Sequence, residues 1–218
     1  MNTSEISTGK RAAHREEVRA KIEDALLECM ASGQMNRINH DALAEMTGVS
    51  RRTVYRYFPD RDALMKALWH RTIEVQGPRG GMPRDAEAVL SRLNDVFTAF
   101  DRNAQAMIVA TSTLEGRAVR NAAKAERDAG WRKALAKETE KLPEPDRKMA
   151  LGVIQLLSTG LAWRELRDQW DLDGSQIATA CRWAIATLLR DLEQRGGRPF
   201  SQDGNGGAAA PARSDSSA

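Results

Sequence analysis

Residues 38–61 read INHDALAEMTGVSRRTVYRYFPDR, and their order predicts two short helices joined by a tight turn. Leu43 gives the first helix a buried side, and Gly48 stands where the turn needs a residue in the left-handed conformation. Val49 can pack in the angle between the two helices, and Ser50 is placed to cap the second helix. This pattern is typical of a helix-turn-helix.

The second helix of this motif divides its side chains between two faces. Val54 and Phe58 are spaced to pack inward, while the outward face carries Arg51, Arg52, Thr53, Tyr55, Arg56 and Tyr57. Between Arg51 and Arg61 there are four Arg and a single acid, Asp60. A short basic run alone usually marks a solvated surface, but within a helix-turn-helix it indicates a helix that enters the major groove of DNA.

The same stretch resembles the helix-turn-helix of the tetracycline-repressor (TetR) family of bacterial transcriptional regulators. The resemblance covers roughly residues 35–68, and it is carried by Leu43, Ala44, Gly48, Val49, Ser50, Thr53, Val54, Tyr55, Tyr57, Phe58, Arg61 and Leu64. Two positions depart from the family pattern. Arg61 replaces a usual Lys and keeps its positive charge, whereas His40 stands at a position that is often apolar.

The resemblance implies a role in DNA binding for each outward residue. Its base contacts are Arg51, Arg52 and Tyr55, and its phosphate contacts are Thr53, Tyr57 and Arg61, with His40 and Arg56 as further phosphate candidates. The chemistry agrees, because a guanidinium can donate two parallel hydrogen bonds to guanine and hydroxyl groups suit phosphate oxygens. The expected partner is double-stranded operator DNA, arranged as an inverted repeat for a homodimer.

Composition limits the other classes of function. Lys+Arg 33 against Asp+Glu 30 leaves a net charge of +3 over 218 residues, so any affinity for DNA must come from local charge. Cys29 and Cys181 are too few for a disulfide framework, lack metal-ligand spacing and are expected in the core. No leader peptide and no uncharged membrane-spanning run is visible, so we expect a cytoplasmic protein with no membrane partner.

The chain is expected to be all-α, with about nine helices. We divide it into a flexible arm (1–12), a three-helix helix-turn-helix domain (13–66), a C-terminal ligand-binding and dimerisation domain (67–195) and a disordered tail (196–218). Expected helices outside the motif span residues 14–31, 60–74, 85–100, 103–114, 115–141, 146–170 and 175–194, with a connecting loop at 77–83.

The last two long helices carry wider apolar surfaces than one neighbour requires, which favours a homodimer built on them. The expected interface residues are Leu157, Ala184, Ile185, Leu188 and Leu189. Family resemblance also implies a cavity for an unidentified small-molecule effector, lined by Phe97, Phe100, Met107, Thr111, Trp131, Gln155, Thr159 and Trp163. Such residues are also ordinary core residues, and the polar ones can bond to helix carbonyls instead.

An enzyme has no support in the sequence. His14, His40 and His70 are scattered, and no phosphate-cradling Gly loop or buried carboxylate pair can be recognised, so we expect no catalytic site, metal or cofactor. The preferred interpretation is a transcriptional repressor that a ligand releases from DNA. A regulator that needs no ligand, an activator, and a helical interaction protein with a non-specific DNA-binding head are the alternatives.

Overall fold

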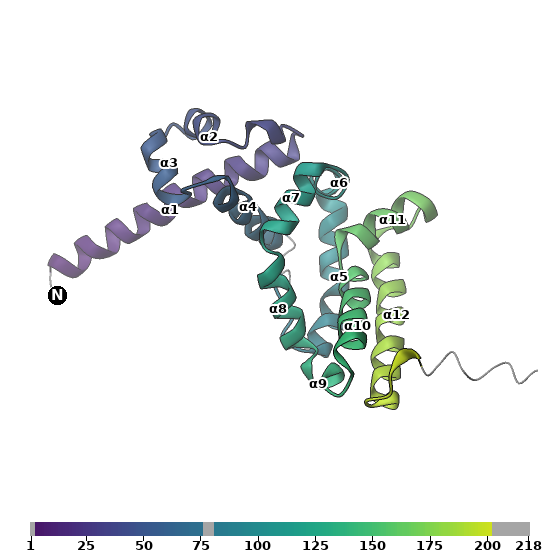
Figure 1. Cartoon of the computed structure of the whole chain (residues 1–218). Coiled ribbons are helices and arrows are strands. Elements are labelled where there is room, and N and C mark those ends of the chain that lie inside the picture. Colours follow the sequence, from purple (N-terminus) through teal and green to yellow (C-terminus); the bar gives the residue numbers. More distant parts are fainter. Residues whose placement is uncertain (1–2, 76–80, 202–218) are drawn as a thin grey trace, which may run out of the picture.

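Twelve α-helices and one short 3-10 helix form the computed structural model, which describes residues 3–75 and 81–201 (Figure 1). No strand occurs in these two ranges, so the all-α prediction is confirmed, whereas nine helices were too few. The elements are α1 Thr3–Ala31, η1 Met35–Arg37, α2 His40–Thr47, α3 Arg51–Tyr57, α4 Arg61–Val75, α5 Ala86–Arg102, α6 Ala104–Ser112, α7 Leu114–Ala122, α8 Lys124–Ala134, α9 Ala136–Thr139, α10 Glu144–Leu156, α11 Gly160–Trp170 and α12 Gly174–Arg195.

The first helix begins earlier than predicted. Helix α1 starts at Thr3, so the flexible arm predicted for residues 1–12 is helical from that residue onward. The sequence there has no apolar stripe, and the prediction relied on such a stripe to mark where the helix begins. Residues 1 and 2 lie outside the described range.

Two predicted helices are divided in the structure. The predicted helix 115–141 becomes α7, α8 and α9, with breaks at Ala123 and Leu135. The predicted helix 146–170 becomes α10 and α11, because Thr159 adopts an extended conformation and its hydroxyl accepts a hydrogen bond from the Leu161 amide at 3.3 Å. Threonine at this point serves as the cap of a new helix rather than as a member of a continuous one.

Helices α1 to α4 form the head, which lies at one end of the molecule in Figure 1. Its core contains Leu26, Leu43 and Val54, and it continues through Leu68 of α4. The boundary predicted after residue 66 therefore falls inside α4, a continuous helix that reaches from the head toward the rest of the chain. Two residues of later helices, Ala110 of α6 and Val119 of α7, also belong to the head core.

The C-terminal helices share a second core, in which α12 packs along α5. Gly174 permits this close approach, because a Cβ atom there would lie 2.5 Å from the carbonyl oxygen of Phe97. The Asp101 carboxylate joins three helices, since it accepts hydrogen bonds from the Gly174 amide at 2.6 Å and from Trp163 Nε1 at 2.8 Å. Asp173 and Gln176 add a capping box at the start of α12.

The predicted disordered tail is wrong for its first residues. Phe200 is half-buried against the C-terminal core, and the Arg195 guanidinium lies 4.7 Å from the centre of its ring. This aromatic side chain packs a short segment that is otherwise polar and Gly-rich against the core. Residues 202–218 of the tail and 76–80 of the predicted loop lie outside the described residues.

Candidate nucleic-acid interface and internal cavity

Local capping and turn chemistry set the geometry of the helix-turn-helix. The Asn39 side chain accepts a hydrogen bond from the Ala42 amide at 2.9 Å at the start of α2, and Gly48 ends that helix with φ 67°. Ser50 then caps α3, because its hydroxyl accepts a hydrogen bond from the Thr53 amide at 3.1 Å. With Val54 fully buried, α3 can present only its opposite face to solvent.

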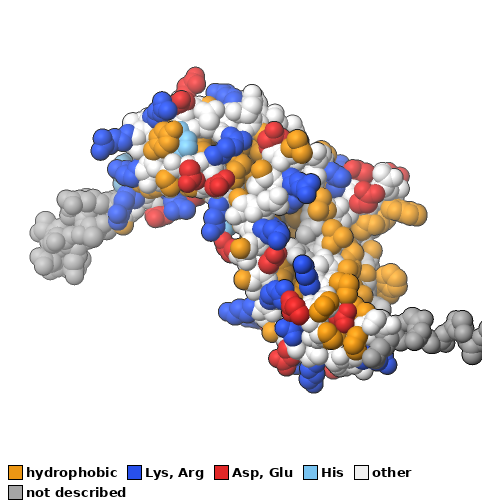
Figure 2. Space-filling model, viewed as in Figure 1, with side chains coloured by type: hydrophobic (Ala, Val, Ile, Leu, Met, Phe, Trp, Pro, Cys, Tyr) orange, Lys and Arg blue, Asp and Glu red, His pale blue; other side chains and the backbone are white. Residues whose placement is uncertain are grey.

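The exposed face of α3 brings together the predicted DNA contacts. Arg51, Arg52, Tyr55 and Arg56 are exposed, and Figure 2 shows Lys and Arg side chains gathered on this head. Thr53 and Tyr57 are half-buried at the edges of the same helix.

Arg51 is held by neighbours within the head. Its Nε atom lies 2.8 Å from Asp41 Oδ1 of α2, and its guanidinium lies 5.5 Å from the centre of the Tyr55 ring. The Tyr55 side chain, followed by the Asp41 carboxylate, raises the pKa of Arg51. Both the ion pair and the ring hold Arg51 against the surface of α2 and α3.

Two of the predicted phosphate contacts are bonded to the backbone of the head. His40 Nε2 lies 2.7 Å from the Phe58 carbonyl oxygen, and Arg61 Nη1 donates to the Ile38 carbonyl at 2.9 Å. The first bond joins the start of α2 to the residue after α3, and the second joins the start of α4 to the segment before α2. The hydroxyl of Thr53 lies 2.8 Å from that of Ser50, so it too has a partner inside the motif.

A cavity of about 270 Å³ lies among the helices that follow the head. Trp69, Thr72 and Ile73 of α4 form part of its wall, and the remaining wall comes from residues of α5 to α8, α10 and α11 and from the segment before α5. Small-molecule sites in proteins span about 300–1,000 Å³, so this cavity is near the lower end of that range.

Most residues predicted for the ligand pocket line this cavity. They are Phe100, Met107, Thr111, Trp131, Gln155 and Thr159. Phe97 and Trp163 do not line it, because both side chains are fully buried in the C-terminal core. Both side chains are large and apolar, and that property alone does not show which side of α5 or of α11 faces the cavity.

Sequence reasoning missed the three arginines in the wall, Arg92 of α5, Arg120 of α7 and Arg127 of α8. Burial lowers the pKa of Arg92 to about 10 and also lowers the pKa values of Arg120 and Arg127. A signal was present for Arg92, since it stands at helical spacing between Val89 and Val96 on the buried stripe of α5.

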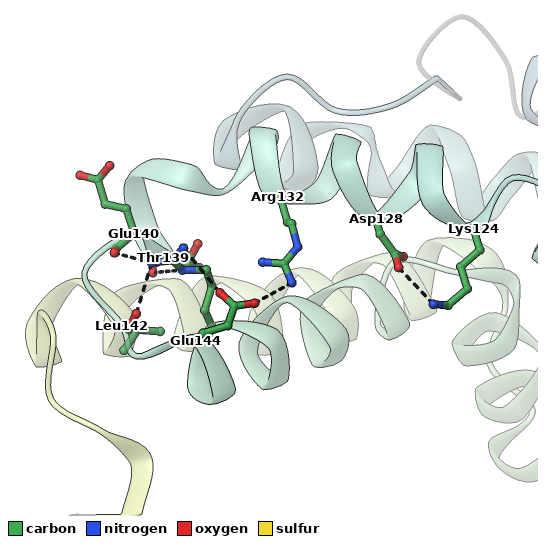
Figure 3. A network of polar contacts seen from close by, with 8 residues as sticks. Lys124, Asp128, Arg132, Thr139, Glu140, Leu142 and Glu144 are labelled. Carbon is green, nitrogen blue, oxygen red and sulfur yellow. Dashed lines mark hydrogen bonds and ion pairs between the residues drawn. The ribbon is translucent and has the colours of Figure 1, made fainter.

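Polar contacts fix the far end of the helices that flank the cavity (Figure 3). Arg132 of α8 donates to Glu144 Oε1 of α10 at 2.8 Å, and this partner lowers the pKa of Glu144. Arg147 donates to the carbonyl oxygens of Thr139 at 3.1 Å and Glu140 at 2.6 Å. These bonds hold α8, and the segment that contains α9, against the start of α10.

The predicted dimer residues are mostly turned toward the protein's own core. Ile185 is fully buried within one chain, so its side chain is not available to a second chain, contrary to its expected place in the interface. Leu157, Leu188 and Leu189 are half-buried against the C-terminal core, and Ala184 is half-buried.

Other apolar residues are exposed on the same helices, and we call these the outer apolar face: Met149, Val153 and Leu156 of α10, and Trp183 of α12. Val153 keeps 48% of its surface exposed and Trp183 keeps 74%. Figure 2 shows hydrophobic side chains gathered over this part of the molecule.

Cysteine and metal chemistry receive no support from the geometry. Burial raises the pKa of Cys29 and raises that of Cys181 to about 11, which keeps both groups as thiols at neutral pH. In residues 3–75 and 81–201, no group of three His, Cys, Asp or Glu side chains is arranged to hold a metal ion. Within the same ranges, no helix has the length and apolar character needed to span a bilayer.

Comparison with known proteins identifies the head. Residues 22–68 match the family model described as bacterial regulatory proteins, tetR family. This range contains most of α1, all of α2 and α3, and the first half of α4. No curated protein matches the chain.

Proposed function

The chain belongs, through its N-terminal region, to the tetR family of bacterial regulatory proteins, and we propose that this DNA-binding regulator is a repressor released from its operator by a small-molecule effector. The observation that carries the proposal is α3 itself. It is the second helix of the helix-turn-helix and presents Arg51, Arg52 and Tyr55 to solvent, as a helix that reads the major groove must.

We assign base contacts to Arg51, Arg52 and Tyr55, and phosphate contacts to Thr53, Arg56 and Tyr57. Arg56 is exposed and its guanidinium lies 5.2 Å from the Tyr57 ring centre, which holds both side chains at one edge of α3. For His40 and Arg61, the bonds to Phe58 and Ile38 favour a positioning role, with phosphate contact as a second function of Arg61.

Dimerisation is part of the proposal, because two heads are needed to read the two halves of an inverted repeat. The outer apolar face of α10 and α12 is the surface that we assign to the second copy. It leaves four large side chains exposed, and a two-fold pairing of these helices would remove them from water.

Helix α4 is the proposed connection between effector and DNA. Leu64 and Leu68 belong to the head core, whereas Trp69, Thr72 and Ile73 of the same helix line the cavity. A ligand that requires a different position of these wall residues would move a continuous helix, and the head would move with it. The effector then favours a spacing of the two heads that no longer fits DNA.

The decisive experiment is selection of binding sites from a random double-stranded DNA pool, followed by titration of the selected site and a scrambled one at several salt concentrations. We expect an inverted repeat to be enriched. Arg52→Ala is expected to cost about 1–3 kcal/mol and to relax preference at one position in each half-site. Arg56→Ala is expected to weaken all sequences alike and to lower the salt slope by about one unit.

Arg102→Ala is the matched control, since Arg102 is an exposed arginine on α5 outside the head. A wild-type protein with no preference between selected and scrambled DNA, but with steep salt dependence, would support the alternative of a non-specific DNA-binding protein. Sequence-specific binding without any effect of Arg52→Ala would remove α3 as the reading element.

A further inference from the structure

The cavity behind the head collects positive charge. Arg92, Arg120 and Arg127 come from three different helices, and all three line the same space. Among the described residues of its wall there is no Asp or Glu. The described wall therefore contributes three cationic side chains and no carboxylate of its own.

Neutral oxygens orient these guanidinium groups. Arg120 Nη1 donates to the Ala110 carbonyl, Arg127 Nη1 donates to the Arg120 carbonyl at 2.7 Å, and Arg92 Nη1 donates to the Gly81 carbonyl. A carbonyl oxygen accepts a hydrogen bond but supplies no full negative charge. A guanidinium has five N–H donors, so the bond to Ala110 or to Arg120 uses only one of them.

Neighbouring positive charges disfavour the charged form of Arg120. Burial lowers the pKa of Arg120 most, and the charges of Arg127, Arg117 and Arg164 lower it further. Burial likewise lowers the pKa of Arg127, which the nearby Asp128 offsets in part. The Asp128 carboxylate also pairs with Lys124, whose Nζ atom lies 3.5 Å from Asp128 Oδ2, so Arg127 shares this negative charge with another cation. An added anion would relieve this repulsion.

Apolar side chains form much of the rest of the wall, beside five polar residues, Thr72, Thr111, Gln155, Ser158 and Thr159. Phe100, Met107, Trp131 and Leu156 contribute rings and aliphatic chains to the cavity. These surfaces suit a hydrocarbon or aromatic body, which gains free energy by leaving water. Cationic groups beside apolar walls together match a ligand with one charged end and one apolar end.

We propose that the effector of this regulator is a small organic anion, with an apolar body against the aromatic and aliphatic wall and a carboxylate or sulfonate head bound by Arg120 and Arg127. The inference rests on the proposed effector-controlled function and specifies the chemistry of its ligand. Arg92 adds positive charge from α5. The cavity volume of about 270 Å³ limits the body to a small molecule.

The anion site also touches the helix that leads to the head. The Arg127 guanidinium lies 5.3 Å from the centre of the Trp69 ring, and Trp69 belongs to α4. An anion bound by Arg127 competes with this contact for the same cation. Binding of an anion would therefore weaken the contact between Trp69 of α4 and Arg127 of α8.

The test uses isothermal titration calorimetry of the full chain with 2-naphthoate and its neutral isostere, 2-naphthamide. A second anion, naphthalene-2-sulfonate, has the same body as 2-naphthoate and distinguishes a sulfonate from a carboxylate head. We expect 2-naphthoate to bind at least about tenfold more tightly than the amide, since a charged hydrogen bond adds at least that factor. Arg120→Gln and Arg127→Gln should each remove most of this preference, while Arg127→Lys should retain part of it.

Arg102→Gln, an exposed arginine on the same helix as Arg92, is the control and should keep the full preference. Circular dichroism of every variant establishes that it is folded, and the Arg127 variants decide the question if Arg120→Gln does not fold. Equal binding of naphthoate and naphthamide, or no binding of either anion at millimolar concentration, would overturn the anion assignment.

The same samples separate this inference from the proposed function. Release of operator DNA by 2-naphthoate supports both. Charge-selective binding that leaves DNA binding unchanged supports the anion site and contradicts effector release through α4. Loss of DNA binding with no preference for anions would contradict the anion site and leave effector control standing.

Discussion

The His40 imidazole stacks on the Tyr55 ring, with centroids 3.8 Å apart and planes 2° from parallel. His40 lies at the first turn of α2 and Tyr55 lies on α3, so the stack joins the two helices of the DNA-binding motif. With the hydrogen bond to the Phe58 carbonyl, it holds a predicted base-reading side chain in one orientation.

His40→Ala is therefore expected to destabilise the head and to weaken operator binding. Loss of the stack and of one hydrogen bond costs about 1–3 kcal/mol. Thermal unfolding should show a lower Tm, by roughly 2–4 °C for each kcal/mol. His14→Ala, which changes an exposed histidine of α1, is the control. An unchanged Tm with a reduced salt slope would instead make His40 a phosphate contact.

Asp41→Asn is expected to increase affinity for DNA. The Asp41 carboxylate holds Arg51 at 2.8 Å and adds negative charge beside the α3 surface that we assign to DNA. An ion pair this exposed is weak, so its removal should cost the head little and should strengthen binding by up to about a few-fold. Titrations against the selected operator measure the effect.

Glu45→Gln removes another negative charge from α2 and serves as the control for Asp41→Asn, because Glu45 pairs with Arg37 at 3.9 Å rather than with α3. Equal gains from both variants would show a general charge effect. A loss of affinity in Asp41→Asn would mean that the ion pair positions Arg51 for DNA.

Val153→Glu and Trp183→Glu are expected to give folded monomers. Both residues belong to the outer apolar face, so a carboxylate there is solvated in the monomer and buried in the proposed dimer. Ile185→Glu should instead prevent folding, because Ile185 is 0% exposed within one chain. Light scattering and circular dichroism distinguish these results.

Leu114→Glu, at a residue of α7 that is 80% exposed, controls for adding a charge to an exposed apolar position. If Val153→Glu and Trp183→Glu remain dimers, the interface lies on another surface. A folded Ile185→Glu monomer would restore the sequence-based assignment of that residue.

Glu126 is expected to make the contact between α4 and α8 sensitive to acid. Lys66, followed by His70, lowers the pKa of Glu126 from its ordinary value of 4.5. A carboxyl group with a lowered folded-state pKa binds more protons when unfolded, so its stabilising effect is complete above 4.5 and is lost as the pH falls through the lowered value. The Glu126 carboxylate is exposed, so its contribution to the free energy of unfolding is below about 1 kcal/mol.

Glu126→Gln should therefore lower the Tm at neutral pH and leave it nearly unchanged in acid, relative to the wild type. Thermal unfolding over a series of pH values measures the difference, with Glu115→Gln on the exposed surface of α7 as the control. A difference between Glu126→Gln and wild type that is independent of pH would contradict the ionic origin of the contact.

The DNA-binding motif could be predicted because its signals are local. Gly48 at the turn and Ser50 at the cap act on backbone groups within four residues of themselves, and the structure has both as expected. The buried positions Leu43 and Val54 follow from helical spacing over a few turns. Such signals do not depend on what the rest of the chain packs against.

The cavity and the dimer surface needed the tertiary structure. Apolar stripes on α10 and α12 showed that more than one neighbour was needed, but they could not show that Ile185 faces the core while Trp183 faces outward. Likewise, Arg92 lies far in the sequence from Arg120 and Arg127, and the three stand on helices whose relative rotation depends on the packing of all the others. Sequence alone determined the helix-turn-helix, because caps and turns are short-range; only the packing of distant helices decided where charge and apolar surface meet.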